Sequence, residues 1–339
     1  MDFRQDYFYN QSMKKRPLYI ALMIICFASS IAILMSLLSK PAPSSEVALN
    51  PVTAGTDAAL ETEVTPAQEA SASGETFKTE APSDIPGGEI PYEIPLCPRD
   101  CLLISKNDTK GVLETSEKED SHQIIVHSGY TLCYREKYEQ PEWVAYTLDF
   151  QKIQKNVARK DNFRADPSVL TGSASPADYK NSGFDRGHLA PSADLTYSFE
   201  TMNDSFFMSN MSPQTADFNR GIWKDLEHEV RCFAEKFDKL WIVTGPVLDK
   251  VEFNSIGQNA VAVPEFYYKA ILAKSGSDFF AIGFIIPNTK CTASFWEYAV
   301  TVDSVEEKTG LDFFYLLEDD AENNIEESFN LSDWMVENE

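Results

Sequence analysis

One short region of the sequence brings together a candidate general base, a cation and two oxygen donors. The region is residues 184–188 (FDRGH), followed by Asn219 and Glu227. An imidazole has an unperturbed pKa of ~6.5, so His188 is the expected base near neutral pH. The planar fork of donors on Arg186 suits a phosphate group. Hydrolysis of a phosphodiester needs both, because water must lose a proton and the phosphoryl oxygens need positive charge.

Asn219 and Glu227 supply the oxygens that a hard metal ion prefers. The side-chain carbonyl of Asn219 is a neutral ligand, and Mg²⁺ keeps several of its waters, so one or two protein oxygens can hold it. Glu227 could hydrogen-bond those waters. We therefore expect Mg²⁺ as the cofactor, with Mn²⁺ as an alternative, and positive charge from the ion on the leaving oxygen.

Three short motifs occur in order around these residues. They are residues 185–188 (DRGH), 210–214 (NMSPQ) and 219–223 (NRGIW), with Glu227 after them. This ordered set resembles the DNA/RNA non-specific endonuclease family, which includes secreted bacterial nucleases and mitochondrial endonuclease G. The similarity extends from about Cys97 to about Glu327. It implies a ββα-metal active site and one-metal hydrolysis of DNA and RNA, without sequence preference, to 5′-phosphate products.

The same resemblance assigns roles to individual residues. It makes His188 the general base, Asn219 the direct metal ligand and Glu227 a catalytic carboxylate that supports the ion. Arg186 is the implied phosphate contact, and a structural ion pair with Asp185 is the alternative reading of that arginine. Asp185 itself is expected to orient Arg186 or to cap a turn.

Two further residues are implied to contact the substrate. Arg159 matches an arginine that lies upstream of the motif in relatives, and Arg164 is its competitor for that role. Asn210 matches a family position near the site, and its alternative is a turn residue. The remaining histidines are expected to lie outside the site: His127 as a structural residue of a strand, His228 on another face of the helix and His122 on the surface.

The predicted strands should position this site. Residues 123–135 and 143–150 are rich in β-branched and aromatic side chains and are separated by a polar loop. Further strands are expected at residues 240–247, 266–273 and 279–286, the last two forming a hairpin through residues 275–277. We expect an α+β fold with a mostly antiparallel central sheet and flanking helices. The segment 184–189 should be a strand of the metal-site unit.

One long helix is predicted over residues 217–237. Its apolar side chains recur at helical spacing and form one face: Ile222, Leu226, Val230, Phe233 and Phe237. Asn219 and Glu227 would lie ~80° apart around this helix, so both could face one site. Asn219 would fall in the first turn, where free backbone N–H groups favour phosphate. Shorter helical segments are expected at residues 295–302 and 305–309.

The N-terminal region predicts a membrane anchor. Residues 17–39 contain no charged side chain and are mostly apolar, which is long enough to cross a hydrocarbon core of ~30 Å. Three basic residues precede this segment and favour a cytoplasmic N-terminus at residues 1–16. The rest of the chain would then lie outside the cytoplasm, in a bacterial periplasm or at the cell surface. Secretion after signal cleavage and a mitochondrial location are the alternatives.

The charge distribution separates the remaining parts of the chain. Residues 40–95 are rich in Pro, Ala, Ser, Thr and Glu and should form a disordered tether. Residues 96–327 should form the endonuclease domain, and residues 328–339 a loosely held acidic tail. The net charge is −24, but residues 152–190 carry seven basic and four acidic side chains. This basic stretch could guide DNA or RNA, the expected partners.

The cysteines of the outward-facing part could form disulfides, which an oxidising compartment permits. Cys97 and Cys101 could close a short loop, and some secreted relatives carry a similar loop near this point. Cys232 with Cys291 is the second expected pair, which leaves Cys133 over, buried in a strand. A zinc site is the alternative, but the chain has no two paired Cys-x-x-Cys units.

Two other functions compete with a nuclease. The first is a tethered receptor that binds nucleic acid without cleaving it, although such a receptor has no use for a general base. The second is a hydrolase of another phosphodiester, against which the basic stretch before the motif argues. Homodimers occur in the family that the chain resembles, so a homodimer is a further expectation.

Overall fold

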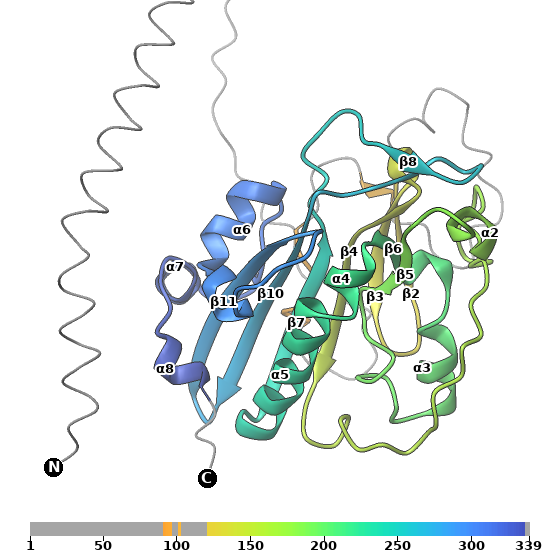
Figure 1. Ribbon diagram of the computed structural model, residues 1–339. Helices are drawn as coiled ribbons and strands as arrows, with labels where there is room; N and C mark the ends of the chain where they lie inside the picture. The colour runs from red at the N-terminus through yellow and green to blue at the C-terminus, as the bar shows by residue number, and fades with distance from the viewer. Residues whose placement is uncertain (1–90, 97–100, 103–120, 336–339) are drawn as a thin grey trace, which may run out of the picture. The chain divides into compact units, whose positions relative to one another are not determined.

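A computed structural model describes residues 91–96, 101–102 and 121–335 (Figure 1). The predicted cytoplasmic segment, the anchor, nearly all of the tether and the last four residues lie outside the described residues. The same holds for Cys97 and for the side chain of Cys101. None of the helices in the described ranges has the length and apolar character to cross a bilayer.

An eight-stranded sheet forms the centre of the described domain. Its order is β1-β2-β3-β4-β7-β10-β11-β12, and β1 pairs with β2 in parallel while the other neighbours are antiparallel. The α+β class with a mostly antiparallel sheet is therefore confirmed. The strands are β1 (Cys101–Leu102), β2 (His122–Val126), β3 (Thr131–Arg135), β4 (Gln140–Leu148), β7 (Lys239–Pro246), β10 (Phe266–Ser275), β11 (Asp278–Pro287) and β12 (Ala299–Val300).

The first predicted strand is in fact a hairpin. Residues 123–135 divide into β2 and β3, because the chain turns back between them and His127 N donates to Tyr130 O at 2.9 Å. Ser128 and Gly129 lie in this turn, and both residue types favour turns. A Cβ on Gly129 would stand 2.7 Å from the Leu195 side chain, so the turn packs closely against the segment that follows the catalytic motif.

Helices cover both faces of the sheet. On one face, α5 (Ile222–Lys236) packs its predicted apolar side chains against the strands, and this face contains Tyr267 and Ile271 of β10. On the other face, α6 (Val302–Thr309) packs against β10 and β11, with Tyr268 of β10 in that second core. The remaining helices are α2 (Pro176–Tyr179), α3 (Phe199–Asp204), α4 (Ala216–Asn219), α7 (Asp319–Glu326) and α8 (Leu331–Trp334).

Two small two-stranded sheets and three short 3₁₀ turns complete the described fold. β5 (Asp185–His188) pairs with β6 (Met211–Gln214), and β8 (Ser255–Ile256) pairs with β9 (Val261–Ala262). The 3₁₀ turns are η1 (Glu136–Tyr138), η2 (Met208–Asn210) and η3 (Phe295–Tyr298). The helix expected at residues 295–302 is wrong, since η3 leads into the edge strand β12 there.

The acidic C-terminal segment is packed, which corrects the expected boundary at residue 327. Helix α8 places Trp334 in the core with 1% of its surface exposed. Its ring lies 5.0 Å from the ring of Phe233 and 5.2 Å from that of Phe237, both at the end of α5. A tryptophan side chain buries a large apolar surface, and this gain outweighs the tendency of the neighbouring acidic residues to stay in water. The folded domain therefore continues through α8.

The disulfide expected between Cys232 and Cys291 does not form. Both are free thiols, as is the buried Cys133. Cys291 points its sulfur toward the backbone carbonyls of Pro287 and Thr289 instead, at 3.9 and 3.5 Å. Helix α5 and the loop after β11 therefore pack through their apolar side chains and not through a covalent bridge.

Candidate active site

The two-stranded β5–β6 sheet contains the candidate catalytic motif at residues 185–188. Arg186 and His188 alternate with Asp185 and Gly187 along β5, so the first two side chains lie on one face of the strand. A Cβ on Gly187 would stand 2.1 Å from the side chain of Gln214 on β6. A glycine is therefore required between the arginine and the histidine, because the buried glutamine occupies the space over its backbone.

The His188 imidazole lies in an aromatic and cationic environment. Its ring makes edge contacts with Phe163 at 5.6 Å and Phe206 at 5.1 Å between centroids. Its Nε2 atom is buried and has no hydrogen-bond partner in the described chain. Burial, together with the nearby positive charges of Arg159 and Arg186, lowers the pKa of His188 to about 3. The imidazole is therefore neutral and able to accept a proton at neutral pH.

Asn219 ends helix α4, and its amide is held in one orientation. Its Nδ2 donates to Asp185 Oδ2 at 3.0 Å, whereas no described residue donates to its carbonyl Oδ1. Asp185 also accepts two hydrogen bonds from Arg220, at 2.6 and 2.8 Å. The expected partner of Asp185 was Arg186, so this expectation is corrected. Asp185 instead orients the amide so that its oxygen is free to meet a metal ion.

The single long helix predicted over residues 217–237 is wrong at its beginning. Helix α4 ends at Asn219, and α5 begins at Ile222 after a break at Gly221. A Cβ on Gly221 would stand 2.4 Å from the carbonyl oxygen of Asp217, so the chain bends tightly here and only a glycine fits. Asn219 is thus not in the first turn of the long helix, and the ~80° separation from Glu227 does not apply.

Glu227 on α5 belongs to a desolvated charge cluster. Burial raises the pKa of Glu227, and the negative charge of Asp194 raises it further, while Lys269 and Arg231 lower it. Arg231 donates to Asp194 Oδ1 at 2.8 Å. Lys269 is fully buried on β10, with its Nζ free of hydrogen bonds from the described residues and 4.9 Å from the Trp223 ring. The sequence indicates this buried lysine, because Lys269 is the only charged residue in the otherwise apolar run of residues 266–273.

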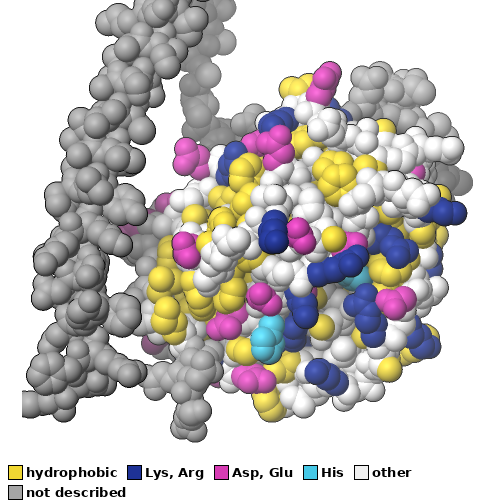
Figure 2. Space-filling model, viewed as in Figure 1, with side chains coloured by type: hydrophobic (Ala, Val, Ile, Leu, Met, Phe, Trp, Pro, Cys, Tyr) yellow, Lys and Arg dark blue, Asp and Glu magenta, His cyan; other side chains and the backbone are white. Residues whose placement is uncertain are grey.

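An open cleft of about 700 Å³ lies beside β5 and the end of α4. Figure 2 shows lysine and arginine side chains gathered on the face that carries β5 and α4. The charged and polar residues that line the cleft are Arg159, Asp161, Lys180, Asp185, Arg186, Asn219 and Arg220. Lys180 belongs to the basic stretch 152–190 that was expected to guide nucleic acid, whereas Arg220 was not singled out, because a single basic residue carries no pattern of its own.

The two candidate phosphate-binding arginines both lie in the cleft. Arg186 is exposed, with its guanidinium carbon 4.0 Å from the Phe163 ring centre. Arg159 donates to Ser192 Oγ at 2.6 Å, and 53% of its side chain is exposed. Its competitor Arg164 donates to the backbone carbonyls of Asn162 and Asn203 and does not line the cleft. The geometry therefore favours Arg159 as the second cation.

Asn210 does not face the cleft, so the expected substrate contact is corrected. It is fully buried, and its Nδ2 donates to the carbonyls of Ala190 and Ser205 at 2.9 and 3.0 Å. Its Oδ1 accepts from Ala190 N at 2.9 Å. All of its polar atoms are used in fixing the chain just after His188, which is the structural role that was its alternative.

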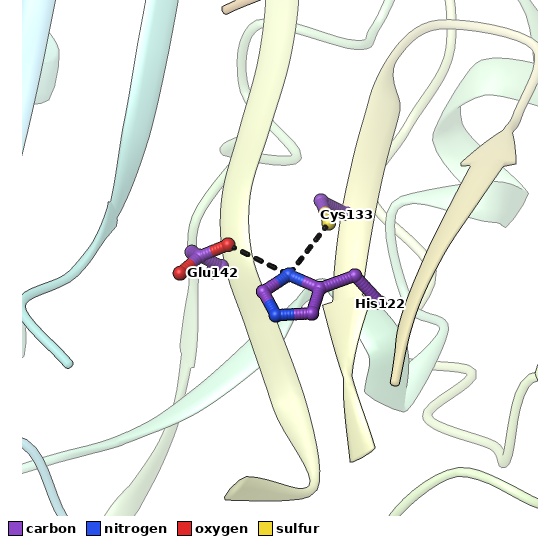
Figure 3. Close-up of side chains that lie close together, drawn as sticks. All are labelled: His122, Cys133 and Glu142. Carbon is purple, nitrogen blue, oxygen red and sulfur yellow. Dashed lines mark hydrogen bonds and ion pairs between the residues drawn. The ribbon is translucent and has the colours of Figure 1, made fainter. Parts of the chain in front are cut away.

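The other histidines lie outside the cleft. His127 is held by Asp166 at 2.8 Å, which confirms its structural role, and His228 is exposed. His122, expected on the surface, is buried and lies 3.1 Å from Glu142 and 3.7 Å from the sulfur of Cys133 (Figure 3). Such a trio could hold a metal ion, and Arg135 forms an ion pair with the Oε1 atom of Glu142 at 2.8 Å.

Comparisons with known proteins agree with this geometry. A family model described as DNA/RNA non-specific endonuclease matches residues 108–320. The mitochondrial nuclease EXOG of Danio rerio is 36% identical, over 59% of this chain and 63% of that protein. A nuclease of Nostoc sp. is 32% identical, over 70% of this chain and 89% of that protein.

A solved structure has the same fold over most of its length. The crystal structure of the EndoG/EndoGI complex, described as showing the mechanism of EndoG inhibition, is 30% identical with a TM-score of 0.55. The match covers 58% of this chain and 88% of that one. This chain spans 56–63% of the length of the EXOG nucleases that it matches.

Proposed function

Because this chain belongs to the DNA/RNA non-specific endonuclease family, we propose that it is a metal-dependent nuclease that hydrolyses phosphodiester bonds in DNA and RNA. One observation carries the proposal. A neutral imidazole with an unpartnered Nε2 lies beside an arginine-lined cleft, and the same cleft contains an asparagine whose carbonyl oxygen is free. A base, phosphate-binding cations and a metal ligand thus occur together.

His188 acts as the general base. Its Nε2 takes a proton from water, which attacks the phosphorus in line with the leaving 3′-oxygen, and the product carries a 5′-phosphate. Arg186 and Arg159 hold the phosphoryl oxygens in the cleft and neutralise their charge. Positive charge on both sides of the imidazole keeps it unprotonated until the substrate brings its negative charge.

Asn219 suits a magnesium ion. Its Oδ1 is a single neutral oxygen ligand, which fits an ion that keeps most of its waters, and we propose that Glu227, ionised when the cation is bound, hydrogen-bonds those waters. When bound, the ion supplies positive charge that stabilises the leaving oxygen. Asp185 fixes the ligand by accepting from Asn219 Nδ2.

Broad specificity follows from the same contacts. The cations of the cleft bind phosphate, which carries no sequence information. We therefore infer cleavage of single- and double-stranded DNA and RNA with little base preference. The test is degradation of matched DNA and RNA strands with Mg²⁺, Mn²⁺ or EDTA, with mapping of the product ends. Comparable rates on both sugars and 5′-phosphate ends are expected, whereas strict rejection of one sugar would contradict the broad specificity.

The two competing functions are distinguished by the same kind of assay. A tethered nucleic-acid receptor would bind DNA with a steep salt dependence but would not cleave it in Mg²⁺. A hydrolase of small phosphodiesters would cleave a chromogenic diester in the presence of excess DNA, whereas a nuclease would be inhibited by it. The basic cleft favours a long polyanion over a small diester.

The cellular location is a separate proposal. We propose that residues 17–39 anchor the domain in a membrane with the nuclease on the side away from the cytoplasm. The names of the EXOG and endonuclease G relatives place those proteins in mitochondria, which supports the mitochondrial alternative over a bacterial envelope. Fractionation of the tagged full-length protein, with and without carbonate extraction, distinguishes an anchored form from a secreted one.

A further inference from the structure

Three carboxylates meet between helices α6 and α7. This region lies on the face of the sheet opposite to α5, so it is separate from the catalytic cleft. Asp303 and Glu306 are three residues apart on α6 and therefore share one side of that helix. Glu326 is the last residue of α7. One ligand oxygen or more from each of the three lies within 4.8 Å of the others.

The carboxyl group of Glu326 is buried, and one of its oxygens lacks a hydrogen-bond donor among the described residues. Only 5% of its surface is exposed, and its Oε1 has no hydrogen-bond partner in the described chain. Glu306 has one backbone donor, Phe313 N, at 2.7 Å. A buried carboxylate without partners is costly, and native structures usually explain such an atom by a water or an ion.

The charges around Glu326 have the same sign. Burial, together with the negative charges of Glu306, Glu322, Asp303 and Asp312, raises the pKa of Glu326 to about 9. Lys308 is the only basic residue after position 302, and it pairs with Asp249 at 2.7 Å instead. Among the described residues, no lysine or arginine forms an ion pair with Asp303, Glu306 or Glu326.

We propose that Asp303, Glu306 and Glu326 bind a calcium ion that ties α7 to α6. Calcium accepts irregular sets of carboxylate oxygens at about 2.3–2.6 Å, so oxygens on opposite sides of one ion lie about 4.6–5.2 Å apart. One oxygen from each of the three carboxylates lies within 4.8 Å of the other two, so the three can contact a single calcium ion. Magnesium requires shorter, near-octahedral bonds and gives up its waters reluctantly. The calcium site does not depend on the proposed nuclease function.

The test is thermal unfolding of the full-length protein at increasing Ca²⁺. All variants carry Asn219→Ala, so that an ion in the catalytic cleft does not contribute. A site in the affinity range of about 0.1–1 mM should raise Tm by about 3–10 °C at 10 mM Ca²⁺. Glu326→Gln should abolish this rise, and without Ca²⁺ its Tm should equal or exceed that of its parent, because a neutral amide replaces a buried carboxyl group whose charged form is disfavoured by its neighbours.

Two further variants make the result specific. Glu327→Gln, an exposed neighbour on the same turn, should keep the full rise. Asp303→Asn, which is also exposed, leaves the core intact and should weaken Ca²⁺ binding in calorimetry at least tenfold. A parent protein whose Tm does not respond to Ca²⁺, a Glu326→Gln protein with an unchanged rise, or an equal response to Mg²⁺ would each overturn the calcium site.

Discussion

The position of His188 determines its protonation state. A free imidazole is half protonated near pH ~6.5, but burial and two arginines remove the proton from this one. The unpartnered Nε2 shows that nothing in the described chain satisfies this atom at rest. The environment of His188 therefore leaves a neutral imidazole whose Nε2 atom can accept a proton, as the proposed role of a general base requires.

A titration of the His188 ring tests this state. In the metal-free protein the ring should stay neutral down to pH 5, since its pKa lies near 3. The unfolded chain binds this proton near pH ~6.5 and the folded chain does not, so the free energy of unfolding falls as pH drops below that value. Arg186→Ala should raise the pKa, because one repulsive charge is lost. NMR of the ring measures it, and titration near pH 6.5 would contradict the description.

A second residue-scale prediction concerns Asp185. Asp185→Asn removes the acceptor that orients the Asn219 amide and pairs with Arg220. We expect the Mg²⁺ concentration for half-maximal cleavage to rise about 10–100-fold, the usual effect of losing such an orienting group. Asp217→Asn, an exposed carboxylate on the same short helix, is the control and should leave the Mg²⁺ dependence unchanged. Equal Mg²⁺ dependence of both variants would rule out the orienting role.

The break between α4 and α5 is the decisive feature at the scale of elements. Helix α4 ends so that the side-chain amide nitrogen of Asn219 donates to Asp185 on β5, while α5 begins at Ile222 and carries Glu227. The bend requires Gly221, because its missing Cβ leaves room for the Asp217 carbonyl oxygen. Asn219 and Glu227, the two residues that we propose to support the metal ion, thus come from different helices.

Replacing this glycine tests the importance of the bend. Gly221→Ala places a methyl group 2.4 Å from a backbone oxygen, so the two helices must move apart. We expect a loss of about 1–3 kcal/mol in the free energy of unfolding and about 100-fold lower turnover, since a shift of ~1 Å at a site has that effect. Gly276→Ala, in the β10–β11 turn with open space around it, should keep full turnover. Wild-type turnover in Gly221→Ala would show that the bend is unimportant.

The elements were predictable where the pattern is local. The apolar face of α5 and the β10–β11 hairpin follow from side-chain periodicity and a Ser-Gly-Ser turn, and both are confirmed. The break at Gly221 was not predicted, because a glycine near the beginning of a helix is compatible with one continuous helix or with two. The burial of Asn210 was also hidden, since a motif match does not distinguish a substrate contact from a residue that fixes the backbone.

The whole molecule uses its acidic C-terminus as part of the fold. Residues 303–339 carry thirteen acidic side chains and one basic one, a composition typical of solvated tails. Trp334 overrides that composition by packing against the end of α5. Because α5 also carries Glu227, the C-terminal helix supports the helix on which this proposed catalytic residue lies.

Removing this contact should destabilise the domain. Trp334→Ala should lower the free energy of unfolding by about 3–5 kcal/mol, the usual cost of deleting a large buried aromatic side chain. The control is Met335→Ala, since Met335 is 48% exposed, and its effect should stay below about 0.5 kcal/mol. Chemical denaturation of both variants measures the difference. A Trp334→Ala protein as stable as its control would show that the C-terminal segment is a loose tail after all.

The cleavage of supercoiled plasmid by His188→Ala tests the central claim most directly. The wild-type protein should nick and then degrade the plasmid in Mg²⁺ and not in EDTA. His188→Ala should lose at least about 100-fold in rate, the typical contribution of a general base, with an unchanged circular dichroism spectrum. His228→Ala, an exposed histidine on α5, should cleave at the wild-type rate. A folded His188→Ala protein within a few-fold of wild type would contradict the account of this site.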